Sequence, residues 1–185
     1  MCSSDLTLKR MLRRYSREEY LACVERLRAA IPGLSITTDI IVGFPGETDD
    51  EFEETLSAVR DVQFDDAFMF KFSMRDGTPA QRLPAELRVS EAVVDERFER
   101  LKDLVRSIAR EKNLRRLGER REVLIEKEAR KGEGLLQARS RDFKTVIVPG
   151  DPSMIGSYLH VELSGTTGST FTGLPVAERA QLPMA

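Results

Sequence analysis

Residues 38–48 read Thr38-Asp-Ile-Ile-Val-Gly-Phe-Pro-Gly-Glu-Thr48, a short β-branched run that ends in a turn with two glycines. The run predicts a strand over residues 36–42, and Gly43-Phe-Pro-Gly46 predicts a tight turn directly after it. Glycine has no Cβ, so a flat or polar ligand can approach the backbone at such a strand end. Asp39 lies within the strand, and its carboxylate can accept hydrogen bonds from two vicinal ribose hydroxyls. From the residues alone, a ligand site and a plain strand-to-helix turn are both open interpretations.

Helical periodicity on both sides of this strand predicts an alternating α/β unit. Ser16 with Glu19, and Thr48 with Glu51, have the capping-box spacing that begins a helix. The order αβαβ favours a parallel sheet. The remaining predicted elements are a helix that ends at Pro32-Gly33, a helix after Thr48, a strand over residues 67–72 and a loop over residues 73–84.

The second half of the chain changes its hydrophobic period from that of a helix to that of strands. A long helix is predicted over residues 90–117, and Gly118 stands where a glycine commonly ends a helix. Five short strands within about 60 residues then predict a small closed β-barrel, because closure removes exposed strand edges. The predicted strands are residues 122–126, 135–139, 145–148, 157–163 and 170–173.

Composition favours a globular protein without a membrane segment. The chain has 185 residues, of which 41% are hydrophobic and 32% charged. The net charge of −2 gives no overall attraction to nucleic acid, so any RNA affinity must come from local patches. No stretch approaches the roughly 20 apolar residues of a membrane span, and no signal-peptide core follows the N-terminus. We therefore expect a cytoplasmic protein that does not associate with a membrane.

Cysteine and histidine are scarce. The chain contains Cys2, Cys23 and the single histidine His160. Two distant thiols exclude a disulfide scaffold and any zinc or iron–sulfur site built from this chain alone, so no metal-binding residue is predicted. We expect Cys23 to be a buried thiol on the apolar face of its helix. His160 lies in a predicted strand without a partner for catalysis.

Three stretches carry a resemblance to a known family: LKRMLRRYSREEY from Leu8, TDIIVGFPGET from Thr38 and FMFKFSMRDGTPA from Phe68. They are similar, in order and spacing, to the core of the radical-SAM methylthiotransferase family. The segment from about Glu119 to Ala177 resembles the TRAM domain, an RNA-binding β-barrel, that follows this core. The resemblance implies the C-terminal part of a partial β/α barrel with a bridging helix over residues 1–117. It implies a small antiparallel, OB-like barrel over residues 118–185.

The resemblance also implies a site for S-adenosylmethionine. Arg13 matches the family arginine that pairs with the carboxylate of the cofactor, a contact that suits a planar guanidinium. Asp39 matches the acidic residue that holds the ribose. Of the alternating Phe68, Phe70 and Phe72, we expect two to lie in the core. The implied cofactor-binding residues are Ser4, Arg13, Asp39, Ile41, Val42, Gly43, Phe72 and Ser73.

Two regions are expected to face the substrate. Arg75 and Thr78 match a family loop on the substrate side. In the barrel, five basic residues against Glu133 and Asp142 give a local charge of +3 (five minus two), which suits phosphates. Ordinary surface charge is the alternative interpretation. The basic residues are Arg130, Lys131, Arg139, Arg141 and Lys144, and we predict RNA contacts at Lys131, Arg139, Arg141 and Lys144.

The implied activity belongs to a longer enzyme. Complete family members use S-adenosylmethionine and two 4Fe–4S clusters, whose ligands this chain lacks, so we expect no catalytic residue here and an inactive chain in isolation. The implied reaction adds a methylthio group to C2 of N6-isopentenyladenosine next to the tRNA anticodon. The expected partner is the anticodon stem-loop, and the expected state is a monomer. The alternatives are the branch that modifies a ribosomal protein and a stand-alone RNA-binding module.

Overall fold

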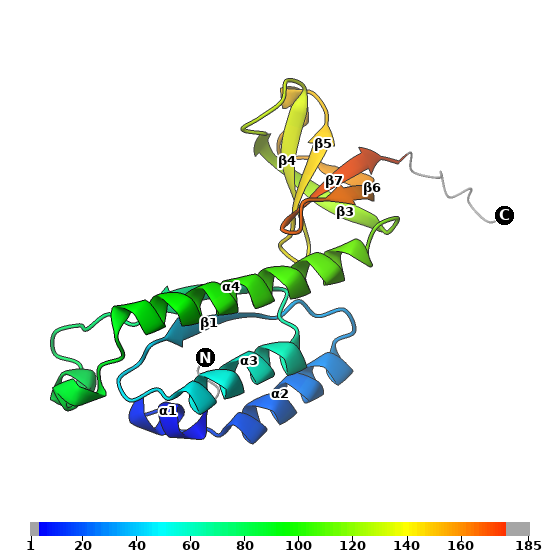
Figure 1. Cartoon of the computed structure of the whole chain (residues 1–185). Helices are drawn as coiled ribbons and strands as arrows, with labels where there is room; N and C mark the ends of the chain where they lie inside the picture. The colour runs from blue at the N-terminus through cyan, green and yellow to red at the C-terminus, as the bar shows by residue number, and fades with distance from the viewer. Residues whose placement is uncertain (1–3, 177–185) are drawn as a thin grey trace. The chain divides into compact units, whose positions relative to one another are not determined.

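The computed structural model describes residues 4–176 and divides into two compact units, residues 1–109 and residues 110–185 (Figure 1). The division falls within the long helix α4, Glu91–Leu114. The first unit also contains α1 (Asp5–Arg10), α2 (Arg17–Ala30), β1 (Thr37–Val42), α3 (Asp49–Val62), β2 (Asp66–Lys71), η1 (Pro79–Arg82) and η2 (Ala85–Leu87). The second contains β3 (Arg120–Glu128), β4 (Leu135–Ser140), β5 (Thr145–Pro149), η3 (Pro152–Met154), β6 (Tyr158–Thr166) and β7 (Thr170–Pro175).

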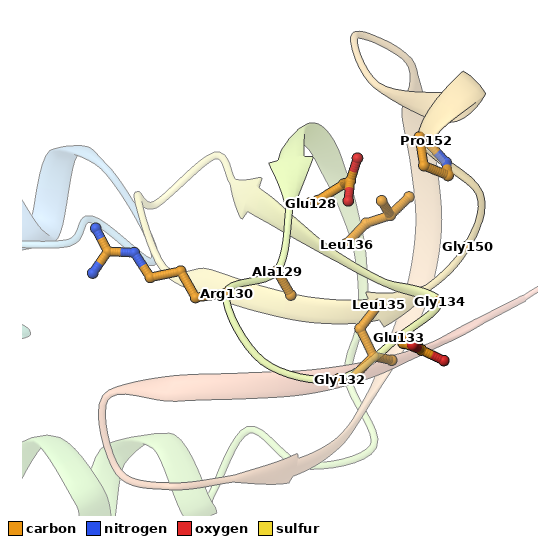
Figure 2. Close-up of a pocket in the computed structure, with 10 residues that line it drawn as sticks. All are labelled: Glu128, Ala129, Arg130, Gly132, Glu133, Gly134, Leu135, Leu136, Gly150 and Pro152. Carbon is orange, nitrogen blue, oxygen red and sulfur yellow. The ribbon is translucent and has the colours of Figure 1, made fainter.

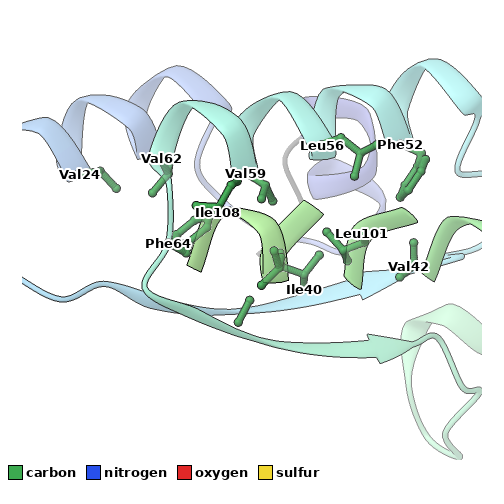
Figure 3. Packing of buried hydrophobic residues seen from close by; sticks show 12 residues of the cluster. Val24, Ile40, Val42, Phe52, Leu56, Val59, Val62, Phe64, Leu101 and Ile108 are labelled. Carbon is green, nitrogen blue, oxygen red and sulfur yellow. The ribbon is translucent and has the colours of Figure 1, made fainter. Parts of the chain in front are cut away.

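The first unit is a two-stranded parallel sheet with helices packed on one face. Strands β1 and β2 pair in parallel register, which confirms the predicted alternating α/β unit. Ile40 and Val42 of β1 are fully buried among apolar side chains of α3 and α4 (Figure 3). Phe64, just before β2, closes the same core. Burial of these side chains is the main stabilising contribution to this unit.

The predicted helix starts are confirmed, whereas α4 ends at Leu114, three residues before the predicted end at residue 117. In both capping boxes the hydroxyl accepts from the backbone three residues on, at 3.2 Å for Ser16 and 3.3 Å for Thr48. After α4, Gly118 has a φ of +85°, and its N–H donates to the carbonyl of Leu163 at 2.8 Å. A left-handed backbone at this position favours glycine, which lets the chain turn from the end of α4 into β3.

The second unit is a closed five-stranded barrel, as predicted, and its strands follow the order β3-β4-β5-β7-β6. Four neighbouring pairs are antiparallel, and β5 pairs with β7 in parallel. Alternate residues face the interior, so each strand shows the period of two seen in its sequence. The interior side chains are Val123, Ile125, Leu136, Ala138, Val146, Val148, Val161, Leu163 and Phe171.

The prediction that Cys23 is buried is wrong, because its side chain is exposed. Tyr20 and Val24 of α2 pack against the core instead. Tyr20 and Val24 are four residues apart, about one helical turn, so they lie on the same side of the helix. Cys23 directly precedes Val24, and its side chain is rotated from that of Val24 by roughly 100° about the helix axis. The apolar stripe of α2 is thus narrower than its sequence indicated.

Candidate functional site

The turn after β1 is held by a buried carboxylate. Gly43 has a φ of +77°, and its N–H donates to Oε2 of Glu47 at 2.9 Å. A Cβ at Gly43 would lie 2.5 Å from Val94 Cγ2, so this position has no room for a larger residue. Glu47 is 5% exposed. The glycine therefore serves both the backbone conformation and close packing against α4.

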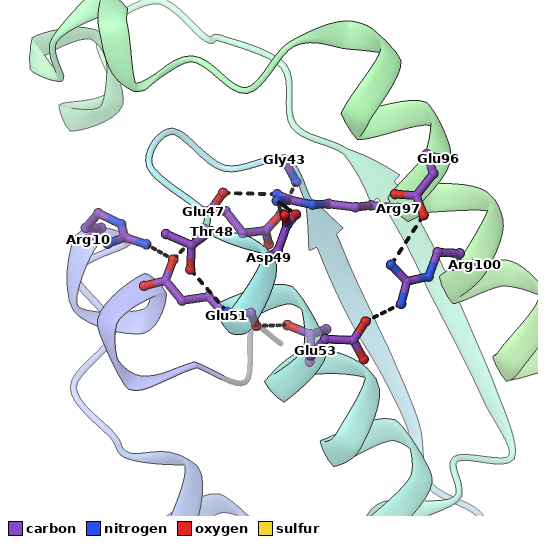
Figure 4. A network of polar contacts seen from close by, with 11 residues as sticks. Arg10, Gly43, Glu47, Thr48, Asp49, Glu51, Glu53, Glu96, Arg97 and Arg100 are labelled. Atoms are coloured by element: carbon purple, nitrogen blue, oxygen red, sulfur yellow. Dashed lines mark hydrogen bonds and ion pairs between the residues drawn. The ribbon is translucent and has the colours of Figure 1, made fainter.

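Arg97 of α4 fixes that carboxylate in place (Figure 4). Its guanidinium is 2.9 Å from Oε2 and 3.0 Å from the carbonyl oxygen of Glu47, and 2.6 Å from Oδ1 of Asp49. Burial raises the pKa of Glu47, although the Gly43 N–H and Arg97 both act to lower it. Arg97 was not predicted as a site residue from the sequence. Its spacing from Val94 and Leu101 places it on the apolar face of α4, and a charged residue on that face could have indicated a buried ion pair.

A second ion pair ties the N-terminal segment to α3. Arg10 donates to the buried carboxylate of Glu51 and, at 3.0 Å, to the hydroxyl of Thr7. The predicted residue Ser4 is buried and caps α1, where its hydroxyl accepts from Thr7 N–H at 3.3 Å. Arg13 is exposed. The structure therefore assigns the neighbouring Arg10 to a structural ion pair and leaves Arg13 open to solvent.

The uncovered face of the β1–β2 sheet brings together two predicted cofactor residues and two phenylalanines. Asp39 pairs with Phe68 and Ile41 with Phe70 in the parallel register. Phe68 is 63% and Phe70 50% exposed, so the expectation that two of the three phenylalanines lie in the core is wrong. Helices cover only the opposite face, where the side chain of Val42 is buried. Of the predicted β1 side chains, Asp39 and Ile41 share the open face, and Val42 does not.

The loop after β2 lies beside the Gly43 turn. The Phe72 N–H donates to the carbonyl of Val42 at 2.8 Å, and the Phe72 ring meets the Phe44 ring edge to face at 5.0 Å. Gly43 and Phe72 line a pocket of about 400 Å³ together with Lys71, Met74, Arg88 and Val94. The structure thus brings two predicted cofactor residues to one cavity.

The predicted substrate loop is an ordered turn. The Thr78 hydroxyl donates to the carbonyl of Arg75 at 2.8 Å, and Gln81 bonds both Gly77 N–H and Asp76 within the same loop. The side chains of Ser73 and Arg75 are exposed, and Thr78 is half-buried. Arg75 is therefore available to a ligand.

The described residues, 4–176, contain no group of three or more His, Cys, Asp or Glu side chains that could hold a metal ion. Cys2 lies outside the described residues. The described part of the chain therefore does not fit a four-iron cluster, and we derive no step through one.

The basic residues predicted to bind RNA do not form one patch. Arg139 makes a bidentate pair with Glu126, 3.0 Å for each contact, and Arg141 lies 3.5 Å from Glu122. Lys144 is 9% exposed, which leaves little of it for a phosphate. The linear charge balance missed both glutamates, because they face the arginines across the β3–β4 pairing. A surface of alternating charges replaces the expected cationic patch.

Arg130 and Lys131 lie at the other end of the barrel. They belong to the loop between β3 and β4, whereas Arg141 follows the far end of β4, five residues or about 17 Å away along the strand. Figure 2 shows Arg130 beside a pocket of about 360 Å³ whose lining includes Glu128 and Glu133. Lys131 is exposed. The four predicted RNA contacts thus divide between two ends of one strand.

Comparisons with known proteins match both units. The Radical SAM superfamily model matches residues 2–59, and the TRAM domain model matches residues 114–170. The chain is 42% identical to the tRNA-2-methylthio-N(6)-dimethylallyladenosine synthase of Pelotomaculum thermopropionicum over 92% of its length. It is 43% identical to proteins of the same name from Methylacidiphilum infernorum and Geobacillus kaustophilus, over 94% and 95% of its length. Both units of the chain are thus similar to radical-SAM methylthiotransferases.

The chain spans 38%, 37% and 33% of the lengths of those three relatives. The first unit carries the radical-SAM match, and the closed barrel carries the TRAM match. Within the described part of the chain, none of the helices is both long and apolar enough to cross a membrane.

Proposed function

We propose that this chain is part of a radical-SAM methylthiotransferase that adds a methylthio group to C2 of N6-isopentenyladenosine next to the tRNA anticodon. The carrying observation is that relatives named as 2-methylthio-N(6)-dimethylallyladenosine synthases match it at 42% and 43% identity through both units. A match to only one of the two units would show that the chain shares one domain with these relatives, and would not support a shared activity. The chain supplies part of the cofactor site and the RNA-holding barrel.

S-adenosylmethionine and the two 4Fe–4S clusters supply the radical chemistry in this family when they are bound. The open face of the β1–β2 sheet fits part of the nucleoside, because the exposed Asp39 carboxylate adjoins the apolar side chains of Ile41 and Phe70. Asp39 accepts the ribose hydroxyls, and Ile41 offers an apolar surface to the adenine. Arg13 pairs with the methionine carboxylate. Cluster ligands are supplied from outside the described residues.

The barrel positions the anticodon stem-loop, and we place the protein in the cytoplasm as a monomer. Lys131 and Arg141 are exposed and can reach phosphates, while Arg139 contributes a guanidinium held by Glu126. Each phosphate contact releases counterions, so affinity is expected to fall as salt rises, with a log–log slope of about 0.7 to 0.9 per contact. Lys144 is expected to contribute least because it is buried.

The activity is tested in a chimera. This chain replaces the matching segment of the Pelotomaculum thermopropionicum synthase, and tRNA from a host that lacks the modification is digested and analysed by mass spectrometry. We expect the methylthio nucleoside to appear. The Asp39→Asn variant should lower its yield about tenfold or more, because a charge-assisted hydrogen bond to the ribose is lost. Asp50→Asn, an exposed carboxylate on α3, is the matched control and should leave the yield unchanged.

The same chimera separates the alternatives. Methylthiolation of a ribosomal protein instead of tRNA would assign the chain to the protein-modifying branch. A chimera that loads its clusters normally yet modifies neither substrate would contradict the proposed activity. Binding of stem-loop RNA by the 185-residue chain, measured by fluorescence anisotropy during a salt titration, tests the role of the barrel independently of the radical chemistry.

A further inference from the structure

Two aromatic rings stand exposed on the barrel. Phe143 is 80% exposed and Tyr158 is 67% exposed, the two largest exposed fractions among the large hydrophobic residues of this unit. Leu159 packs against the barrel interior, so the preceding residue Tyr158 faces outward. Exposed rings of this size contribute little to the stability of the fold. Both rings are therefore available for contact with another molecule.

The strand register connects the two rings through one surface, which we call the ring surface and define by Phe143, Arg139, Leu124 and Tyr158. Tyr158 pairs with Leu124, and Leu124 pairs with Arg139. These three residues lie in one row across neighbouring strands, so the Cα atoms of Tyr158 and Arg139 are about 10 Å apart. One guanidinium nitrogen of Arg139 donates to the carbonyl of Phe143 at 3.3 Å, which places the Phe143 backbone beside the row.

The conformation of Phe143 argues against a structural reason for its ring. Its φ is +61°, a left-handed conformation that disfavours a bulky side chain and suits glycine or asparagine. The turn is maintained by backbone contacts, since Phe143 N–H donates to the carbonyl of Ser140 at 2.9 Å and Ser140 N–H to that of Lys144 at 3.0 Å. The ring therefore adds strain without packing.

We propose that the ring surface stacks unpaired bases of the bound RNA. Every base has a flat π face, and aromatic side chains and guanidinium planes are the usual stacking partners of unpaired bases. Glu126 holds the Arg139 guanidinium by two contacts of 3.0 Å, which keeps its plane oriented. The side chain of Arg141 is 90% exposed and offers a cation for the adjoining phosphate. This inference rests on the proposed RNA-binding role and adds a preference for single-stranded over paired RNA.

The test uses the 185-residue chain and two RNAs of equal length, a stem-loop with an unpaired loop and a fully paired duplex. Phe143→Asn removes one ring and keeps a residue that tolerates the left-handed backbone. Tyr158→Thr removes the other and places there a β-branched residue that also favours strands. The matched control is Leu174→Thr, an outward-facing β7 residue that is 57% exposed. Thermal unfolding confirms that each variant remains folded.

Each ring variant should bind the stem-loop about fivefold or more weakly, because base stacking is lost, while the slope against salt stays unchanged. The ring variants should bind the duplex with the same affinity as the parent. Leu174→Thr should bind both RNAs with the same affinity as the parent. With 2-aminopurine in the loop, the parent should quench its fluorescence and the double variant should not. If both ring variants bind the stem-loop as the parent does, the inference is overturned. If the parent binds neither RNA at low salt, the proposed RNA-binding role fails as well.

Discussion

Gly43 is the residue whose replacement best tests the turn after β1. Alanine there must adopt a φ of +77° and would place its Cβ 2.5 Å from Val94 Cγ2. We expect Gly43→Ala to lower the free energy of unfolding by about 2–4 kcal/mol, combining left-handed strain with overpacking. Urea unfolding followed by circular dichroism measures the change.

A matched glycine separates strain from packing. Gly33 has a φ of +75°, but no atom lies within 4 Å of the point that a Cβ would occupy there. Gly33→Ala should therefore show only the strain, about 1 kcal/mol. Adding Val94→Ala to Gly43→Ala should recover part of the loss. Equal effects of the two glycine variants would show that packing against α4 is not what constrains the turn.

Single residues show where sequence reasoning succeeds and where it stops. Ser16 and Thr48 cap their helices as predicted, because a capping box depends on residues only three apart. The ion-pair partners of Arg97 and Arg139 were not predicted, because Glu47 is distant in sequence from Arg97 and Glu126 lies on the strand next to Arg139. Local spacing carries no information on such contacts until the register is known.

At the level of elements, alternation predicts a strand but not which of its faces is covered. Phe68 and Phe70 of β2 look like core residues in sequence, yet helices pack only on the opposite face of the two-stranded sheet. The positions of β1 and β2 and their parallel pairing were predicted, because each is a short apolar run next to a helix. The side on which a helix packs depends on the whole unit.

This open face has a measurable consequence. Replacing Phe68 and Phe70 together with Thr should change the free energy of unfolding by less than about 0.5 kcal/mol per site, because neither ring is buried. Aggregation at high protein concentration, measured by light scattering, should decrease because an exposed apolar patch is removed.

The contrasting variant is Phe64→Ala. Phe64 is 1% exposed and packs in the core, so its truncation should cost about 3–5 kcal/mol. A comparable loss of stability in the variant that replaces both Phe68 and Phe70 would show that their rings are packed in solution and belong to the core.

Across the whole molecule, the two units carry carboxylates with opposite pKa shifts. In the first unit, burial raises the pKa of Glu47 above its ordinary value of 4.5. In the barrel, hydrogen bonds from Ser140 and Arg116 outweigh burial, which opposes them, and lower the pKa of Asp142 below 3.8. The hydrogen bond from Arg139 likewise lowers the pKa of Glu126. The stability of each unit should therefore depend on pH in its own direction.

The signs follow from proton uptake. As pH falls through the raised pKa of Glu47, the folded first unit binds a proton before the unfolded chain does, so this group's contribution to stability increases. The favourable contribution of Asp142 is complete above its ordinary pKa and is lost as pH falls through the lowered pKa of the folded barrel. As pH falls toward 4.5, the ordinary pKa of a glutamate, the first unit should gain stability from Glu47, and as pH falls below 3.8, the ordinary pKa of an aspartate, the barrel should lose stability.

Met69 and Met154 report the two units separately, because each packs against the core of its own unit. Peroxide oxidation of each methionine across a urea series, read by mass spectrometry, gives one unfolding midpoint per unit at each pH. In Glu47→Gln, the urea midpoint reported by Met69 should no longer rise when the pH is lowered. In Asp142→Asn, the urea midpoint reported by Met154 should be lower than in the parent at neutral pH and should fall less in acid. Each variant should leave the other unit's pH dependence unchanged. If both midpoints instead move in parallel in the parent and in both variants, these two carboxylates do not control the pH dependence of their units.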